Sequence, residues 1–217
     1  KGKGESSPSD TTFGLSPFKI TNMIIIAKLI NNITKSLISG NTGIVHHIYG
    51  CQCCGYVGML HRHGRYTRSV ITLFQVFSMD ITRFKCPVCK KTFSCLPHFL
   101  IPYFRYSYDF ILFCLYYIIK LSKPMNQCVC LLRANNYDCF ISKQSIAYFK
   151  KRFFSILPKV NSFFTRFSEF YYDMDILKMP VTEVAKTVIV KILCFDSVRD
   201  SFNHTYFGEE NSCFFST

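Results

Sequence analysis

Two Cys-x-x-Cys pairs constrain this chain more than any other feature of its sequence. The pairs are Cys51/Cys54 and Cys86/Cys89. A two-residue spacer lets both sulfurs of a pair reach one metal ion from a single turn, and structural zinc sites in proteins use four thiolate or imidazole ligands in a tetrahedron. The two pairs therefore predict one structural Zn²⁺ held by four cysteines in a zinc ribbon.

The residues in and between the pairs favour two tight turns joined by a long hairpin. Gly55 supplies a permissive backbone after the first pair, and Pro87 pre-sets a turn dihedral inside the second. The 31 residues between the pairs, 55–85, exceed the usual spacing of roughly 15–20. A hairpin accounts for the excess, because residues 66–72 and 78–84 are rich in β-branched and aromatic residues and the second run alternates as a pleated strand does.

Other cysteines and histidines compete for these roles. We expect Cys53 to point away from the metal, and His61 and His63 to decorate a basic hairpin. Twelve cysteines would also suit a disulfide scaffold, but the polar first ten residues show no secretory signal, which favours free thiols in a reducing cytoplasm. The remaining cysteines fall largely in apolar stretches and are expected to be buried: Cys95, Cys114, Cys128, Cys130, Cys139, Cys194 and Cys213.

Composition predicts a folded protein with no membrane segment. An apolar fraction of 49% in 217 residues is enough for one large domain or two small ones. No stretch reaches the roughly 18–20 uninterrupted apolar residues of a membrane-spanning helix. The nearest candidate, residues 110–119, is expected to be a buried core helix. We therefore expect a cytoplasmic protein without a membrane partner.

Charge is distributed unevenly around a formal total of +13. Residues 51–105 contain eight Lys or Arg residues and one acid, Asp80, and residues 142–166 contain six Lys or Arg residues and no acid. Residues 167–217 contain eight acids and four basic residues. Two basic blocks of this kind are typical of a surface that binds a polyanion, so DNA is the expected partner.

The second basic block is predicted to be an N-capped amphipathic helix. Ser142 is the candidate N-cap. The apolar stripe, at spacings of three and four, consists of Ile146, Phe149 and Phe153. Two helices are predicted before it, over residues 108–121 and 125–135, followed by a turn-prone link at 135–138. This order matches a helix-turn-helix, whose last helix enters the major groove by its N-terminal residues.

The candidate DNA contacts divide by role. The base-edge candidates are Lys143, Gln144 and Ala147. The phosphate contacts in the same helix are Lys150, Lys151 and Arg152. The phosphate contacts on the hairpin are Arg62, Arg65, Arg68, Arg83, Lys90 and Lys91.

Several motifs follow the first cysteine pair in a fixed order. They are the His-Gly-Arg-Tyr run at 63–66, the basic strand ending in the second pair, Thr-Phe-Ser at 92–94, Leu-Pro at 96–97 and Pro-Tyr at 102–103. In this order residues 44–106 resemble the zinc-ribbon domain of proteins associated with bacterial insertion-element transposases. The resemblance implies DNA binding linked to transposition, the four cysteines as zinc ligands, and often a helix-turn-helix beyond residue 106. It implies no active site.

A complete transposase of the ribonuclease-H type needs three carboxylates around two divalent ions on a large sheet. Acids are scarce before residue 167: Glu5, Asp10, Asp80, Asp109 and Asp138. This scarcity favours a non-catalytic DNA-binding module or accessory protein, which acts beside a separate transposase or as a homo-oligomer. Two alternatives stay open: a catalytic transposase or nuclease that needs a divalent metal, and a zinc-stabilised module that binds protein or RNA.

The predicted fold class is α+β, with a zinc-ribbon β-hairpin domain followed by a mainly helical domain that contains a helix-turn-helix. The expected organisation has four parts: a flexible segment at 1–22, the zinc-ribbon domain with a flanking N-terminal element at 23–105, the helix-turn-helix-like domain at 106–158, and a C-terminal helical segment with an acidic tail at 159–217.

Overall fold

The computed structural model describes residues 50–51, 53–97, 99–166 and 179–198, together with Phe202, Tyr206 and Phe215. The segment predicted to be flexible at 1–22, the element flanking the ribbon, and most of the acidic tail lie outside this part. The described residues form an antiparallel sheet followed by helices, so the expected α+β class is confirmed.

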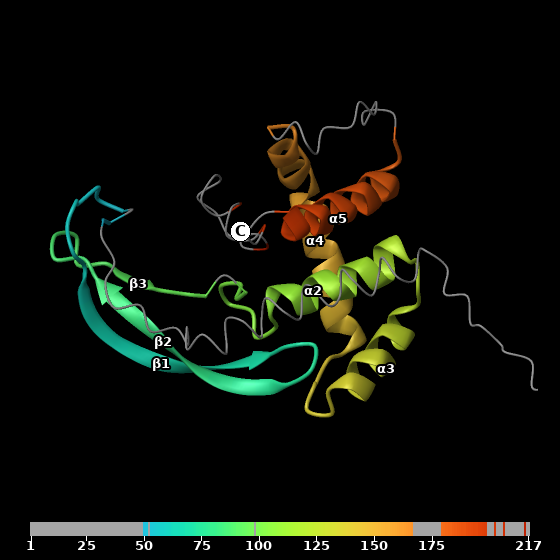
Figure 1. Ribbon diagram of the computed structural model, residues 1–217, viewed down its shortest axis with the longest axis horizontal. Helices are drawn as coiled ribbons and strands as arrows, with labels where there is room; N and C mark the ends of the chain where they lie inside the picture. The colour runs from blue at the N-terminus through green and yellow to red at the C-terminus, as the bar shows by residue number, and fades with distance from the viewer. Residues whose placement is uncertain are drawn as a thin grey trace, which may run out of the picture.

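The sheet has three strands in the order β1-β2-β3. They are β1 (His61–Ile71), β2 (Val76–Lys85) and β3 (Thr92–Ser94). The helices are α2 (Tyr108–Leu115), the π-helical η1 (Tyr116–Lys120), α3 (Met125–Asn135), α4 (Lys143–Phe164) and α5 (Val181–Val198). Figure 1 shows β1 and β2 as a long curved ribbon that extends away from the helices.

The turn end of the ribbon is attached to the helical part. Thr72 closes the turn, since its hydroxyl accepts a hydrogen bond from the Gln75 backbone N–H at 3.2 Å. The Ser107 N–H, at the start of α2, donates to the Ile71 carbonyl at 2.9 Å. The side-chain amide of Asn136 donates to the Thr72 carbonyl at 3.1 Å. The ribbon is therefore held at this end by the segments that lead into α2 and α4.

Strand β2 is covered on opposite faces at its two ends. Near the turn, Met79 and Ile81 pack in a small cluster with Val70, Phe99 and Leu100. Near the far end, Phe84 points to the other face and packs in a second cluster with Leu60, Cys51 and Cys86. Positions 79, 81 and 84 therefore follow the two-residue alternation expected of a strand. The short β3, which pairs with the far end of β2, had no counterpart in the predicted elements.

The three helices predicted between residues 108 and 153 are present. Helices α2 and η1 together cover the predicted helix at 108–121, and α3 has the predicted bounds. The hydroxyl of Ser142 caps α4 by accepting from the Ser145 N–H at 3.1 Å. Helix α4 continues through Pro158 to Phe164, so it runs across the boundary expected between residues 158 and 159.

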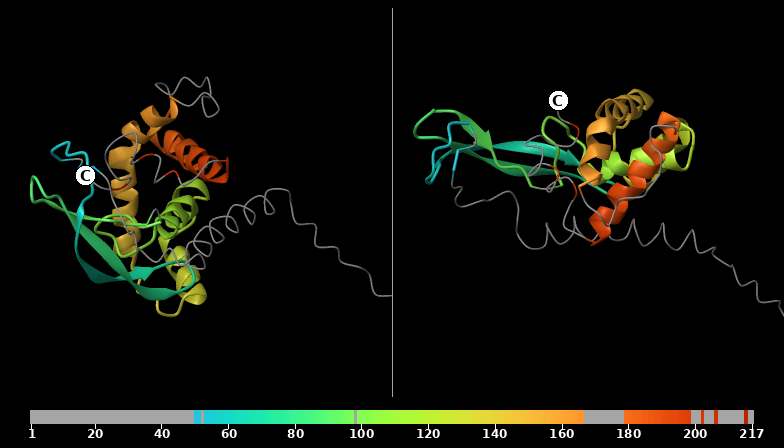
Figure 2. Two further views of the ribbon diagram at one scale, coloured as in Figure 1. Left: turned by 60° about the vertical axis from the view of Figure 1, so that its left-hand side comes forward. Right: turned by 90° about the horizontal axis from the view of Figure 1, so that it is seen from above.

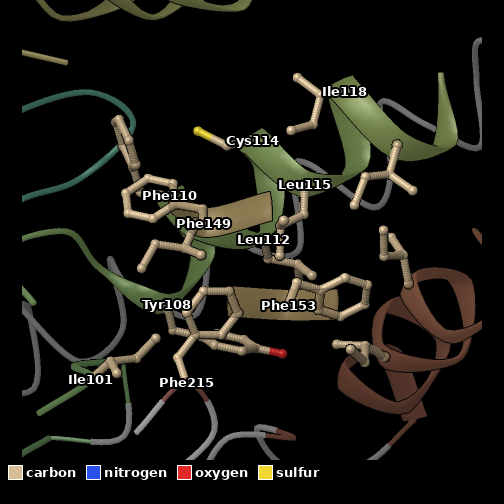
Figure 3. Packing of buried hydrophobic residues seen from close by; sticks show 14 of the residues in the cluster. Ile101, Tyr108, Phe110, Leu112, Cys114, Leu115, Ile118, Phe149, Phe153 and Phe215 are labelled. Carbon is tan, nitrogen blue, oxygen red and sulfur yellow. The ribbon is translucent and has the colours of Figure 1, made fainter. Parts of the chain in front are cut away.

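Helix α2 lies at the centre of the main core. Seven of its residues are buried, and the predicted stripe of α4 packs against it at no more than 2% exposure. Figure 3 shows Phe149 and Phe153 of α4 beside Leu112 and Leu115 of α2. Figure 2 gives two further views of α5, which also packs on α4 and η1. Within the described ranges, no helix combines the length and apolarity needed to cross a membrane.

Cys95, Cys114, Cys128, Cys130 and Cys139 are free thiols. Cys114, Cys128 and Cys139 are buried as expected, and Cys95 is partly buried. The expectation of burial is wrong for Cys130 and Cys194, which are exposed. Both lie in helices, where the 3.6-residue period puts some positions of an apolar stretch on the outer face. Cys213 lies outside the described residues.

Two carboxyl groups lie at the core: Asp109 is buried, and Asp196 is partly buried. The hydroxyl of Tyr108 donates to Asp196 Oδ2 at 2.8 Å, and the backbone N–H of Phe202 donates to Asp196 Oδ1 at 2.6 Å. Burial raises the pKa of Asp196 to about 7 despite these bonds. Burial and the nearby Asp196 raise the pKa of Asp109 well above its usual range. The folded protein therefore holds protons on these groups that the unfolded chain releases.

This burial predicts a stability that falls as the pH rises. In the unfolded chain Asp196 ionises near pH 4, whereas in the folded chain it keeps its proton until about pH 7. Stability is therefore full below about pH 4 and decreases through the interval up to 7, by roughly 2–3 kcal/mol from Asp196 between pH 5 and 7. Urea unfolding at several pH values should show this slope, and Asp196→Asn should reduce it. The matched control is Asp138→Asn at an exposed site, and an equal slope in wild type and Asp196→Asn would contradict the assignment.

Candidate metal centre

The first cysteine pair lies in a turn closed by two backbone hydrogen bonds. The Cys51 N–H donates to the Tyr56 carbonyl at 2.8 Å, and the Gly55 N–H donates to the Cys51 carbonyl at 2.9 Å. Gly55 has a φ of +70°, in the left-handed region that favours glycine. The turn thereby directs the side chains of Cys51 and Cys54 to the same place.

The second pair lies in a turn with the same hydrogen-bond pattern. The Cys86 N–H donates to the Lys91 carbonyl at 3.0 Å, and the Lys90 N–H donates to the Cys86 carbonyl at 3.1 Å. Lys90 occupies the position equivalent to Gly55 and has a φ of 62°. A lysine adopts this conformation only at a cost, because its Cβ crowds the following carbonyl.

The two turns bring the four sulfurs together. The Sγ atoms of Cys51 and Cys89 are 3.6 Å apart, and those of Cys54 and Cys86 are 3.7 Å apart. All four sulfurs lie within 4.8 Å of one another. A tetrahedral zinc ion with Zn–S bonds of about 2.3 Å separates its ligands by about 3.8 Å. The residues therefore fit a four-coordinate metal ion, and over the described part of the chain they form the one such group of three or more His, Cys, Asp or Glu side chains.

Hydrogen bonds to the sulfurs give the thiols different acidities. Burial acts to raise the pKa of Cys86, but backbone N–H groups of Cys89 and Val88 and the neighbouring thiols outweigh it and lower the pKa to about 7. The Lys91 N–H acts to lower the pKa of Cys89, but burial and the thiols of its partners raise it to about 12. Four thiolates this close repel one another, so a cation is needed for all four to ionise, and metal binding releases the protons.

The metal centre lies at the end of the ribbon opposite the helices (Figure 1). The cluster that supports it is small: Cys51, Leu60, Phe84 and Cys86, with Tyr56, Cys89, Phe93 and Cys95 packed against them. So few apolar residues bury little surface, and a bound metal supplies folding energy in such cases. The metal centre and the helical core therefore hold opposite ends of one hairpin.

The competing ligands lie outside this centre. Cys53 is exposed, and a hydrogen bond with its thiol raises the pKa of Lys91. His61 and His63 are exposed on β1. The distinction between Cys53 and its neighbour Cys54, expected from the two-residue spacing, is present in the structure.

The basic residues of the ribbon have different surroundings. Arg62 is exposed, and the Arg65 guanidinium lies 3.8 Å from the carboxylate of Asp80. Arg68 is half-buried and donates to the carbonyls of Ile101 and Phe104, so it joins β1 to the segment that covers the sheet. The remaining bonds are from Arg83 to the Thr92 hydroxyl at 2.9 Å and from Lys90 to the Pro87 carbonyl at 2.6 Å. Lys91 is exposed.

The candidate DNA contacts in α4 lie mainly on its outer face. Those that are exposed are Lys143, Gln144, Ala147, Lys150 and Lys151. Arg152 is partly buried, and its Nε donates to the Phe215 carbonyl at 3.0 Å. The link between α3 and α4, residues 136–142, is longer than the three or four residues of a helix-turn-helix turn. The described fold therefore contains the predicted helices without showing that motif.

Sequence reasoning missed the neighbours of Asp80. The Thr67 hydroxyl donates to Asp80 Oδ1 at 2.9 Å, while Asp80 Oδ2 faces Arg65. A single acid among eight basic residues was the available signal for a special role at position 80.

Replacement of one ligand should remove the metal, whereas replacement of the adjacent thiol should not. We expect Cys54→Ser to lose the bound ion, because three thiolates and a hydroxyl hold zinc far less tightly. Cys53→Ser, one residue away and exposed, should keep one ion per chain. Elemental analysis of purified protein and the charge-transfer absorption of a cobalt-substituted sample measure both outcomes. Equal metal content in the two variants would contradict the assignment.

The equivalent left-handed positions should respond in opposite directions. Gly55→Ala should weaken the metal-bound turn by about 1–2 kcal/mol, because no atom within 4 Å blocks a Cβ and the cost comes from the backbone alone. Lys90→Gly should be neutral or strengthen metal binding, since it relieves the same strain. Competition with a chelator measures both variants. A loss of affinity in Lys90→Gly equal to that in Gly55→Ala would show that strain does not decide the effect.

Comparison with known proteins adds one finding. Residues 51–122 match the model of a family described as a domain of unknown function, DUF6431. The matched region contains the four cysteines, the whole sheet, α2 and η1, and ends before α3. No curated protein and no solved structure matched the chain. The matched region is thus similar to a family whose description names no activity.

Proposed function

We propose that this chain is a zinc-stabilised DNA-binding protein that acts without catalysing a reaction. One observation carries the proposal: a four-cysteine centre closes the far end of a ribbon whose outer strand, β1, is basic and exposed. The centre fixes the ribbon, and the ribbon presents positive charge to a polyanion.

Zinc is the ion that best suits the four sulfurs. Four-cysteine tetrahedral sites are typical of structural zinc, which needs no open coordination position. Soft thiolates also bind Cu(I) and iron–sulfur clusters. That the bound ion is zinc is therefore itself part of what we propose. In this role the ion stabilises the ribbon and does not contact the DNA.

The charge and exposure of the ribbon favour a nucleic acid as the partner. The first seven residues of β1, from His61 to Thr67, are all exposed. Residues 51–105 contain eight basic residues against one acid. Edge strands avoid pairing with other chains when they carry charge, but a positive edge also attracts phosphate. Arg62, Arg65, Arg83, Lys90 and Lys91 are the proposed phosphate contacts, whereas Arg68 joins β1 to the segment that covers the sheet.

Helix α4 is the proposed second contact. Its exposed basic residues form a second positive surface, which begins at Lys143 after the Ser142 cap. The base-reading role predicted for Lys143, Gln144 and Ala147 requires a helix-turn-helix, so we propose only phosphate binding for Lys150 and Lys151. Arg152 contributes to packing through its bond to the Phe215 carbonyl.

A role in transposition is proposed from the resemblance of residues 44–106 to transposase-associated zinc-ribbon proteins. In that role the chain would bind element ends beside a separate transposase or as a homo-oligomer. Preferential binding to the ends of an insertion element over random DNA would support this role. Metal-dependent DNA cleavage by the chain alone would instead favour the catalytic alternative.

DNA binding should weaken steeply with salt. Each phosphate contact releases a counterion, so the logarithm of affinity should fall with the logarithm of salt at a slope of about −0.9 per contact. The variant Lys150→Ala/Lys151→Ala should reduce this slope by about two. Lys123→Ala, an exposed site outside both basic blocks, is the control. Gel-shift titrations of metal-loaded protein against random duplex DNA measure the slopes.

The other outcomes identify the alternatives. Tighter binding to RNA than to duplex DNA would favour an RNA-binding module. Binding of neither nucleic acid would overturn the proposed function and leave a zinc-stabilised protein-interaction module as the better explanation.

A further inference from the structure

We propose that strand β1, and not the N-terminus of α4, reads base edges in the major groove through Arg62 and Arg65, and that Asp80 is a positioning residue for Arg65. This inference rests on the proposed DNA binding and makes it more specific. The sequence alone assigned these two arginines to phosphate.

A β-bulge at His63 puts the two arginines on one face of the ribbon. Arg62 and Arg65 are three residues apart, so a regular strand would point them to opposite faces. The bulge between residues 62 and 64 shifts the register. Arg62 consequently lies opposite Phe84 and Arg65 opposite Thr82, and these partners are two residues apart on β2. Residues opposite each other in an antiparallel pair share a face, so Arg62 and Arg65 share one too.

Gly64 permits this bulge. Its φ is +146°, a conformation that side chains rarely adopt. Gly64 lies opposite Arg83, which therefore occupies the other face and donates to Thr92. The ribbon thus has a face with two exposed arginines and a face with one exposed arginine that is tied to β3.

Asp80 forms an ion pair with Arg65 on the first face. It lies opposite Thr67, whose hydroxyl donates to Oδ1 at 2.9 Å, and Arg65 approaches Oδ2 at 3.8 Å from the neighbouring position of β1. The carboxylate therefore engages both side chains at once. The Arg65 and Asp80 side chains are 55% and 47% exposed, so the guanidinium keeps donors free for another partner.

A carboxylate among the arginines is useful on a surface that reads bases and harmful on one that binds only phosphate. Asp80 is the one acid in residues 51–105. On a surface that binds only phosphate, a carboxylate repels the phosphates and lowers the affinity for DNA. On a surface that reads bases, a carboxylate can fix the plane of an arginine fork, which is useful because guanine recognition requires two parallel hydrogen bonds to O6 and N7. The Thr67–Asp80–Arg65 group fits the second use.

The shape of the ribbon fits the same groove. The major groove of B-DNA is about 12 Å wide and admits a two-stranded β-ribbon. Strand β1 is the edge of the sheet, and its residues from His61 to Thr67 are exposed on both faces. On β2, Phe84 is covered by the metal-centre cluster on the face of the two arginines, and Met79 and Ile81 are covered on the opposite face. The preferred ligand is therefore duplex DNA with guanine at the positions that face Arg62 and Arg65.

The test begins with selection of binding sites from a random duplex library, with full-length metal-loaded protein. We expect guanine at two or more positions, and a loss of about five- to hundredfold in affinity when those guanines are replaced by 7-deazaguanine, which lacks the N7 acceptor. Arg65→Lys keeps the charge and loses the fork, so it should reduce the preference for guanine at one position and leave the position read by Arg62, while the salt dependence stays unchanged. Arg105→Lys, the same change at an exposed arginine outside the strands and outside the named contacts, is the matched control and should keep the preference.

Asp80→Asn provides a second, independent readout. Removal of a negative charge should leave affinity for random DNA equal or higher, whereas the guanine preference should fall. A purely structural role of Asp80 would lower both together, and Asp80→Glu should restore part of the preference. Circular dichroism and metal content verify that each variant is folded.

The outcomes separate the inference from the proposed function. Salt-dependent DNA binding with no effect of 7-deazaguanine, or with an unchanged preference in Arg65→Lys, overturns the inference and leaves the proposed function intact. Loss of guanine preference in Lys143→Ala/Gln144→Ala, with none in Arg65→Lys, assigns base reading to α4 instead. Absence of DNA binding by the wild-type protein overturns both.

Discussion

Closure of the far end of a long hairpin by four cysteine sulfurs is the interaction on which the ribbon depends. The helical core holds the turn end through Ile71 and Leu73, but it does not reach the end where β1 begins and β2 stops. The apolar cluster at that end has four buried residues, two of which are themselves cysteines of the centre. A metal ion held by these sulfurs would do there what side-chain packing does around α2.

The helical part and the ribbon are therefore stabilised by different physical forces. Burial of aromatic and aliphatic side chains organises α2, α4 and α5, and it raises the pKa values of Asp109 and Asp196 at the edge of this core. The ribbon has instead a cluster of four cysteines and many charged residues, and most of β1 is exposed. A surface built in the second way can carry many arginines, because its fold does not rely on excluding water from them.

The parts of the fold and site that could be predicted are those set by residues close together in the sequence. The cysteine spacing, the Ser142 cap and the apolar stripe of α4 each act within a few residues, and the structure contains all three. The bulge at His63, the pairing of β3 and the bonds from Arg68 to distant carbonyls depend on partners far along the chain. Helix α4 passes through Pro158 because the turns on either side pack well enough to tolerate a missing N–H group. The exposure of Cys130 and Cys194 follows from helix orientation, which apolar content alone does not give.

The two metal-binding turns share their hydrogen bonds but not their attachment to the sheet. The second turn connects β2 directly to β3, so two paired strands hold Cys86 and Cys89 in place. The first turn precedes β1 and meets the sheet through the small cluster around Leu60 and Phe84. Assembly of the centre should therefore be ordered in time, with the ion first captured by the preformed half and the other pair folding onto it.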